Sequence, residues 1–559
     1  MGVKSWGGLA LAVALAWTGY VAIFIAPGRP PAPGVETTNW LAARSIALDA
    51  DLRYTDEDGR RYRERFGASP SDLRTDRDGE TLNAPPLASR AWAAAYRIGA
   101  ERGPHALNWL LFASAILLAT WILAPSFGSD APAWVALFAF GSIAFDAVFR
   151  LLPELSALLA VVVAAALVWR PAGRARHLSP APAPDGDPPK LPDQIYSGDA
   201  FGSAARSALW RWPLAGLALG AAALRSPTYL LLALPMAMDL PRRRRGLGGA
   251  LMALGLALPI AFVGAVSGST WEPPSAIFTP ALLGWNALYL LVGRSAGVLV
   301  YFLPLLAILG FSRRLSGDSE GRRLLPFAVL AAAFLQLLLY PFDWTGDRST
   351  LGNPWFLPLY AALWFAIDGR ATRRSIPLVA LAALPALLPF WVSPAARDPR
   401  PPASVRAILE TAVSALPFET TLREIPGAQV VRRSGVRLRS LDPSIGGAGG
   451  QFLWQGSRSA TLIVESDRSL ESIRLELSEN APSQVGVGGG VAGDTIFRPS
   501  GGVALDVALS GPARRHPLWW SREAVSIYFV RLAIPEVPPA PIRVDLAAAK
   551  PSAADVEAP

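Results

Sequence analysis

The sequence predicts a bundle of membrane-spanning α-helices followed by a small β-sandwich, and three observations support this fold class. Of the 559 residues 52% are hydrophobic and 17% are charged, whereas soluble domains carry roughly 25% charged residues. Long apolar runs recur through the first two thirds of the chain, many of them near the roughly 20 residues that a spanning helix needs. From about residue 427 the pattern changes to an alternation of period two, which is typical of strands.

We expect a polytopic membrane domain over residues 1–395 with about eleven transmembrane helices. In this arrangement every short arginine cluster between spans falls on one side, which the positive-inside rule assigns to the cytoplasm. The N-terminus is then cytoplasmic, residues 27–105 form the first outer loop, and the Pro-rich stretch 171–205 is a cytoplasmic linker. The predicted spans lie near residues 6–26, 107–124, 132–150, 155–169, 207–224, 227–240, 247–266, 295–311, 325–340, 355–367 and 376–393.

The C-terminal part is predicted to lie outside the membrane. A linker over 396–426 leads to a β-sandwich over 427–548, whose alternating segments are separated by turns rich in glycine and proline. Residues 549–559 are expected to be a disordered tail. Three tryptophans in this part, Trp454, Trp519 and Trp520, are candidates to stack on sugar rings, with packing in the sandwich core as the more frequent alternative.

Composition excludes several classes of function. The chain contains no cysteine, which removes disulfides, thiolate nucleophiles and cysteine-bound metals. Its three histidines are far apart in sequence, so a histidine metal site is not expected. The net charge of +9 lies largely in arginine clusters between spans and does not imply nucleic-acid binding. The motifs of P-loop and HExxH enzymes are absent from the sequence.

The stretch that begins the first outer loop carries three carboxylates, Glu36, Asp49 and Asp51. Thr37 to Asn39 are suited to cap a helix, and helical spacing of apolar residues from Trp40 predicts a short helix at the water–lipid boundary. The Asp49 and Asp51 pair could bind a divalent cation through oxygen atoms, although a cap or a salt bridge is the commoner role for such a pair. A solvated connector remains the alternative for the whole stretch.

Ionisable residues at the predicted outer ends of spans are the other candidates for chemistry. Arg225, Arg294 and Arg348 lie there against the positive-inside bias, and an arginine can hold a phosphate bidentately. Asp146, Arg150 and Glu154 flank a short turn, Leu151-Leu-Pro153. A carboxylate facing such an arginine can deprotonate a hydroxyl. Binding of bulk lipid headgroups, without chemistry, is the alternative for each arginine.

Several stretches resemble bacterial membrane glycosyltransferases of the GT-C type, the superfamily of the protein O-mannosyltransferases. The segment Gly34-Val-Glu-Thr-Thr-Asn-Trp-Leu-Ala-Ala-Arg-Ser45 is similar to the family's first outer loop, with Glu36 on the family's glutamate and Asp49 and Asp51 on its later aspartates. The resemblance covers roughly residues 1–395. Other similar segments are Gly216–Pro227, Trp285–Gly297 and Gly352–Tyr360.

The resemblance implies an inverting glycosyltransferase in a bacterial inner membrane, which moves a sugar from a polyprenyl-phosphate carrier to a glycan, lipid or protein acceptor on the outer face. Glu36 would be the base, Asp49 and Asp51 supporting carboxylates or metal ligands, and the three outer arginines ligands of the lipid phosphate. Two departures stand out: Val35 replaces the usual aspartate, and Pro354 stands where an arginine is common. The alternatives are a non-catalytic scaffold that binds lipid-linked sugars and, with less support, a transporter.

Overall fold

A computed structural model provides the structure of the protein. In the N-terminal part it describes residues 6–31, 35–67, 70, 73, 81–169, 209–240, 245–267, 280–293, 296–306, 319–341, 344–345, 352–366, 387, 391 and 416. In the C-terminal part it describes residues 431–433, 435–440, 445–448, 451–454, 459–466, 468–478, 481, 484–489, 496–499, 504–509, 513–515, 525–534 and 542–551. Both predicted linkers, except residue 416, and most of the span predicted near 376–393 lie outside the described residues.

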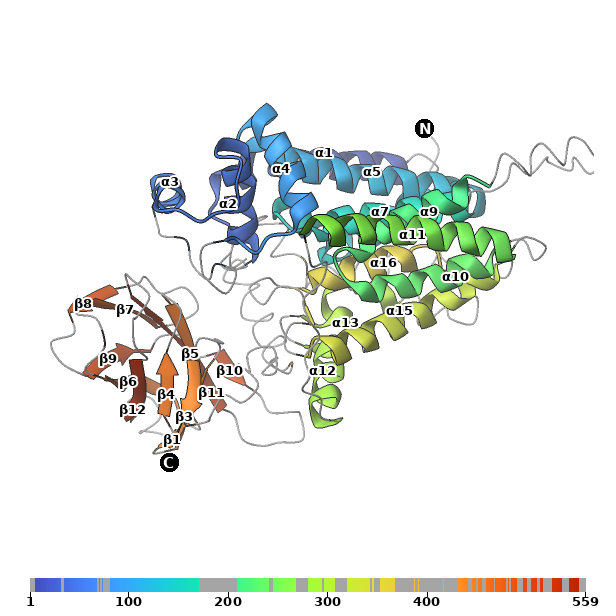
Figure 1. Ribbon diagram of the computed structural model, residues 1–559. Coiled ribbons are helices and arrows are strands. Elements are labelled where there is room, and N and C mark those ends of the chain that lie inside the picture. Colours follow the sequence, from blue (N-terminus) through green and yellow to red (C-terminus); the bar gives the residue numbers. More distant parts are fainter. Residues whose placement is uncertain are drawn as a thin grey trace, which may run out of the picture.

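Long apolar helices run side by side through the described N-terminal part and form one bundle (Figure 1). Its main helices are α1 (Trp6–Tyr20), α5 (Arg102–Phe127), α6 (Ala131–Phe140), α7 (Glu154–Trp169), α9 (Arg211–Ala223), α10 (Ala233–Met238), α11 (Arg245–Ser267), α12 (Pro280–Val292), α13 (Val298–Tyr301), α15 (Glu320–Leu339) and α16 (Leu357–Leu363). Short 3₁₀ segments η5 (Ile143–Phe149), η7 (Pro227–Leu232) and η10 (Pro354–Phe356) precede α7, α10 and α16.

Four helical stretches in the described part are long and apolar enough to cross a membrane: Gly7–Gly28, Arg102–Phe140, Arg245–Ala265 and Glu320–Leu339. The second includes both α5 and α6, which were predicted as part of two separate spans. Shorter apolar helices coincide with predicted spans at Glu154–Trp169, Pro227–Met238 and Pro354–Leu363. The chain is therefore a polytopic α-helical membrane protein, while the total of eleven spans stays a prediction.

Helix packing in the bundle depends on small residues and on buried aromatic rings. Gly216 of α9 faces the main chain of α11 so closely that a Cβ there would lie 1.9 Å from the Met252 carbonyl oxygen, which explains why glycine is needed where α9 and α11 meet. Between α6 and α16, the fully buried Trp134 donates its indole N–H to the Trp364 carbonyl over 3.3 Å. These contacts hold the scaffold to which the outer loop is attached.

The segment predicted to be the first outer loop folds into three helices at one end of the bundle, α2 (Val35–Leu48), α3 (Asp56–Phe66) and α4 (Pro86–Gly99) (Figure 1). The predicted helix starts earlier than expected, at Val35, so Thr37 to Asn39 lie inside α2 and the prediction that they cap it is wrong. Ten of the fourteen residues of α2 are buried, although its composition is mixed. Burial on several sides identifies α2 as part of the packed structure of the loop.

Helix α3 was not predicted, because its sequence is dense in charge. Thr55 begins it with a capping box, in which its hydroxyl accepts from the Asp58 N–H and the Asp58 carboxylate accepts from the Thr55 N–H. On the inner side Tyr62 and Phe66 pack against Trp40 of α2, with ring centroids 5.5 and 5.2 Å away. The outer side carries the charges.

The C-terminal strands form two sheets, as Figure 1 shows. One sheet has the order β1 (Val431–Arg433), β2 (Val436–Ser440), β5 (Ser459–Ser466), β11 (Val525–Ala533), β7 (Gln484–Gly489) and β8 (Ile496–Pro499), with β10 (Ala513–Arg515) also paired to β11. The other has the order β3 (Ile445–Ala448), β4 (Gln451–Trp454), β12 (Ile542–Pro551), β6 (Leu470–Leu477) and β9 (Ala504–Ala508). All described strand pairs are antiparallel.

The interior of the sandwich is an apolar core that includes Trp454, whose side chain is fully buried. Trp454 is therefore a core residue in this structure and not an exposed platform for a sugar. Trp519 and Trp520 lie outside the described residues. Strand β12 continues to Pro551, three residues beyond the predicted end of the domain at 548.

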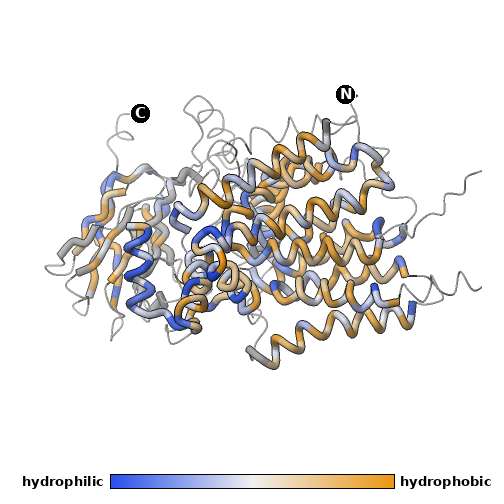
Figure 2. Tube along the Cα trace, turned by 90° about the horizontal axis from the view of Figure 1, so that it is seen from above, coloured by the Kyte–Doolittle hydropathy of each residue, from blue (hydrophilic) through white to orange (hydrophobic). Residues whose placement is uncertain are grey.

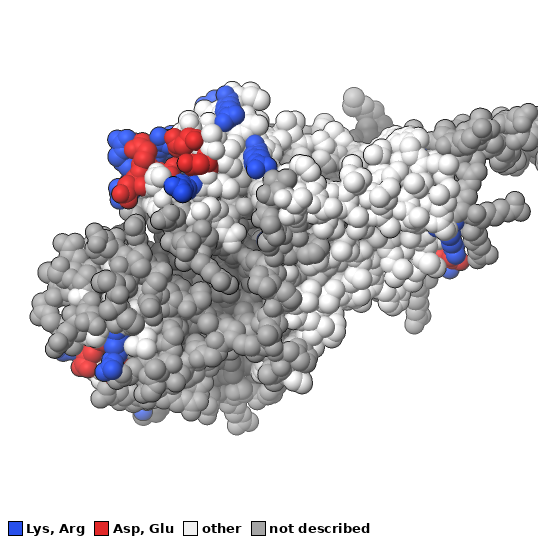
Figure 3. All heavy atoms as spheres, viewed as in Figure 1, with Lys and Arg blue, Asp and Glu red and all other residues white. Residues whose placement is uncertain are grey.

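The surface of the helical bundle is apolar along its length. Figure 2 shows hydrophobic residues along the helices, and charged side chains on the face seen in Figure 3 gather at the two ends of the bundle. Exposed large hydrophobic residues are found on α1, α5, α11 and α15, among them Val13, Leu117, Phe262 and Phe327. Such a surface is the one that lipid covers.

Candidate functional site

Glu36 lies in the first turn of α2 and is buried, with 6% of the residue exposed. Its carboxylate Oε2 lies 3.9 Å from Nη1 of Arg150, in an ion pair whose two side chains are 8% and 7% exposed. A buried carboxylate requires a partner of opposite charge, because desolvation penalises an isolated ion. The structure therefore brings the predicted base together with an arginine from a distant part of the chain.

Arg150 is held more tightly by a second carboxylate. Its Nε–H donates to Asp146 Oδ2 over 2.7 Å, one helical turn back along the chain, and the Asp146 side chain is 4% exposed. Asp146 belongs to η5, whose residues are all buried. Glu36, Asp146 and Arg150 thus form one buried group of two carboxylates and one guanidinium, which we call the acid–arginine cluster.

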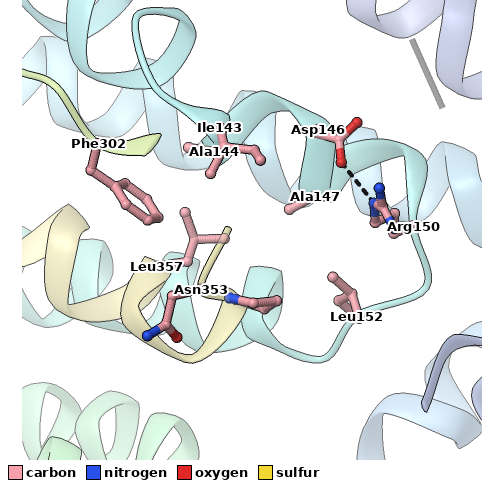
Figure 4. A pocket seen from close by; sticks show the side chains of 10 residues that line it. Ile143, Ala144, Asp146, Ala147, Arg150, Leu152, Phe302, Asn353 and Leu357 are labelled. Atoms are coloured by element: carbon pink, nitrogen blue, oxygen red, sulfur yellow. Dashed lines mark hydrogen bonds and ion pairs between the residues drawn. The ribbon is translucent and has the colours of Figure 1, made fainter. Parts of the chain in front are cut away.

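Asp146 and Arg150 also line a pocket, shown in Figure 4. Its remaining walls are mainly apolar: Ile143, Ala144, Ala147, Leu152, Phe302, Pro354 and Leu357, with Asn353 as a further polar residue. The cavity is small, about 20 Å³, so the structure describes a narrow, mainly apolar hollow with the charged groups at one side and not a formed ligand site.

Arg225 is paired with a different carboxylate. Its Nε–H donates to Glu154 Oε1 over 2.7 Å, and the Glu154 side chain is 1% exposed while that of Arg225 is 24% exposed. Glu154 is the first residue of α7, directly after the turn that follows Arg150. The other carboxylate oxygen, Oε2, is buried without a hydrogen-bond partner among the described residues. The buried acid–arginine cluster and a second, partly exposed acid–arginine pair therefore lie on either side of the Leu151-Leu-Pro153 turn.

Asp49 and Asp51 are found at the other end of α2, in surroundings of a different kind. Asp49 pairs with Arg61 of α3 over 2.6 Å, and Asp51 accepts hydrogen bonds from the Ser45 hydroxyl and the Arg53 N–H. Within the described part of the chain no three acidic or histidine side chains gather as a metal site would require. A divalent cation at these residues stays a prediction, and salt bridging is what the structure describes for Asp49.

The remaining predicted residues, Arg294 and Arg348, lie outside the described residues. Asp146 and Arg150 were predicted only as charges beside a turn, without an assigned role, and the structure adds both to the candidate site. Their signal was present in the sequence, since these charges flank a two-leucine turn at a predicted outer membrane face. No pattern in the sequence indicates that this turn lies next to Glu36 in the folded protein.

Comparisons with known proteins give one distant likeness. No family model matches the chain, and no curated protein matches it. Among solved structures it is similar to the crystal structure of ArnT from Cupriavidus metallidurans bound to undecaprenyl phosphate, with 15% sequence identity, 74% of this chain and 70% of that chain covered, and a TM-score of 0.39. At this distance the function is inferred from the side chains of this chain.

Proposed function

We propose that the protein is a glycosyltransferase that moves a sugar from a polyprenyl-phosphate carrier to an acceptor on the outer face of a bacterial inner membrane. The observation that carries the proposal is the acid–arginine cluster: a buried Glu36, on the position that the family resemblance assigns to the base, beside Arg150 at the wall of a pocket. Base and cation close together are what transfer to a hydroxyl from a phosphate leaving group requires.

In the proposed reaction the acceptor hydroxyl gives its proton to the Glu36 carboxylate while its oxygen attacks the anomeric carbon of the sugar. The bond from that carbon to the phosphate oxygen breaks, and polyprenyl phosphate leaves with the negative charge. The attack comes from the face opposite the leaving group, so the anomeric configuration is inverted. Arginines would stabilise the leaving phosphate; Arg225, Arg294 and Arg348 are the candidates from the sequence, and the structure adds Arg150.

The acceptor is a glycan, lipid or protein of the cell envelope, and the reaction as written uses no cofactor. A divalent cation bound by Asp49 and Asp51 would be an addition to this scheme, with the task of neutralising phosphate charge. The β-sandwich would extend from the membrane domain on the same outer side and contact the acceptor.

The test is transfer from a panel of polyprenyl-phosphate sugars in membranes that carry the wild type, Glu36→Gln or the matched control Glu57→Gln, which removes an exposed carboxylate of the same outer loop. We expect Glu36→Gln to lose about 10²-fold or more, since a general base contributes about 10²–10⁴-fold, and the control to keep its activity. Wild-type turnover that survives Glu36→Gln would move the base to Asp49 or Asp51.

A second candidate is a non-catalytic protein that binds the lipid-linked sugar or acts as a scaffold. Val35 favours it, because the family's usual aspartate is lost there, and so does the direct bond from Arg150 to Asp146 instead of to Glu36. The wild type would then bind polyprenyl phosphate, and resist thermal unfolding in its presence, but transfer no sugar from any donor in the panel.

A further inference from the structure

The main chain of the short segment Arg150–Leu151 accepts hydrogen bonds from side chains of two other helices. Asn39 of α2 donates from Nδ2 to the Leu151 carbonyl over 2.7 Å, across 112 positions of sequence. Asn108 of α5 donates from Nδ2 to the Arg150 carbonyl over 2.6 Å. The two carbonyls are consecutive, so this piece of backbone is bound at adjacent points from two directions.

Asn39 ties the turn to the helix that carries the proposed base. Glu36 and Asn39 are three residues apart on α2, and residues at that spacing share a face of a helix. One face of α2 therefore reaches the Arg150 segment twice, through the Glu36 carboxylate to the side chain and through the Asn39 amide to the backbone. Any movement of the turn relative to α2 would change both contacts together.

The orientation of the Asn108 amide is set by a third residue. The indole Nε1–H of Trp92, in α4, donates to Asn108 Oδ1 over 2.8 Å. Because an indole nitrogen only donates, the oxygen of the amide must face Trp92, which turns the NH₂ group toward the Arg150 carbonyl. Asn39 and Asn108 are 1% exposed and Trp92 is 2% exposed, so water does not compete for these bonds.

We propose that Asn39, Asn108 and Trp92 are positioning residues, which set the separation between Glu36 and Arg150 by fixing the Arg150–Leu151 backbone against α2. The inference rests on the proposed function for its catalytic consequence. None of the three needs to touch the substrate. Their effect is on the rate of the step in which Glu36 takes the proton, because a base displaced by about 1 Å can lose 10²-fold in rate.

The experiment compares Trp92→Phe with Trp134→Phe. Each substitution removes one buried indole N–H that donates a hydrogen bond, but the Trp134 bond joins α6 to α16 and does not involve the Arg150 segment. With a polyprenyl-phosphate sugar as donor, we expect Trp92→Phe to lower kcat about tenfold and to leave KM for the donor within twofold. Trp134→Phe should keep both constants while its Tm falls by a similar amount.

A second measurement does not need activity. Thermal unfolding of the full-length protein in detergent is compared for Trp92→Phe, Glu36→Gln and the double variant, and for the same cycle built on Trp134→Phe. If Trp92 positions the Glu36–Arg150 pair, the Tm loss of the double variant is smaller than the sum of the two single losses, whereas the Trp134 cycle is additive. Equal additivity in both cycles would overturn the positioning role.

The two readouts separate the proposals. A protein that transfers no sugar but shows the coupled Tm shifts would contradict the glycosyltransferase assignment and keep the positioning network. A protein whose activity depends on Glu36 while Trp92→Phe and Trp134→Phe behave alike, in both kcat and Tm, would keep the enzyme and remove the network.

Discussion

Two groups of charges in helices α2 and α3 and their neighbours share residue types but differ in burial and in sequence separation. In the acid–arginine cluster, Arg150 sits between Asp146 and Glu36 with all three side chains less than a tenth exposed. On α3, Arg61 pairs with Asp49 and Glu57, whose side chains are 38% and 40% exposed. We call the second group the α3 surface network; its charged side chains lie over α2 and α3 in Figure 3.

The comparison indicates at which charged residues a substitution lowers the stability of the protein most. Exposed pairs interact through a high dielectric and are screened by salt, so each contributes little. A buried charge that loses its partner has no water to replace it, and the loss is then several times larger. The α3 surface network holds partners that are mostly near in sequence, at spacings that any charged helix offers, whereas the cluster needs a particular fold to form. We therefore place the proposed function in the cluster.

The largest effect is expected for Arg150→Met. The substitution leaves Asp146 and Glu36 as buried carboxylates without their shared cation, and breaking a buried pair in this way destabilises by about 3–5 kcal/mol. Unfolding of the purified protein in detergent, by heat or denaturant, measures the loss. The control is Arg150→Met combined with Asp146→Asn, which removes one of the two buried carboxylate charges left without a cation and should recover part of the stability. If Arg150→Met alone lowers the free energy of unfolding by less than about 1 kcal/mol, the cluster contributes no more to stability than an exposed surface pair does.

The sequence predicts those features of the structure whose pattern lies within a single helix or strand. Helical spacing from Trp40, the apolar runs at Glu154–Trp169 and Glu320–Leu339, and the alternation of strands such as Leu470–Leu477 all lie within one element, and these elements are present. The start of α2 was missed because its first residues are buried by tertiary packing against other elements, which a capping pattern does not reveal.

Helix α3 could have been predicted with the same principles. Thr55 and Asp58 have the spacing of a capping box, and Tyr62 and Phe66 have the i, i+4 spacing of an inner face. The high charge density of the stretch hides these two signals. The pairing of Glu36 with Arg150 is of another kind, because no periodicity joins α2 to a turn more than a hundred positions away; the family resemblance pointed to Glu36 but not to its partner.

A much smaller effect is expected for Arg61→Ala in the α3 surface network. The substitution removes the Arg61 contacts with Asp49 at 2.6 Å and with Glu57 at 2.8 Å, and both carboxylates stay accessible to water. We expect a loss of about 0.2–1 kcal/mol that shrinks as salt is raised. Unfolding at low and high ionic strength measures it, and Arg60→Ala, at a side chain 60% exposed, is the matched control. A salt-independent loss as large as that of Arg150→Met would mean that the contrast between the two groups is not one of burial.

The smallest effect is the pH dependence of Glu57. Hydrogen bonds from Arg60 and then Arg61, with the charges of both arginines, hold the pKa of Glu57 below its ordinary value of 4.5. Since the folded pKa lies below the unfolded one, the contribution to stability is complete above pH 4.5 and is lost as the pH falls through the lowered folded value. The measurement is the difference in Tm between wild type and Glu57→Gln across that window. This difference should be constant above the window and vanish below it, where Glu57 is protonated and resembles glutamine. A difference that grew toward acid pH would have the wrong sign for an ion pair and would assign the stabilisation of α3 to its Thr55 cap and its aromatic face.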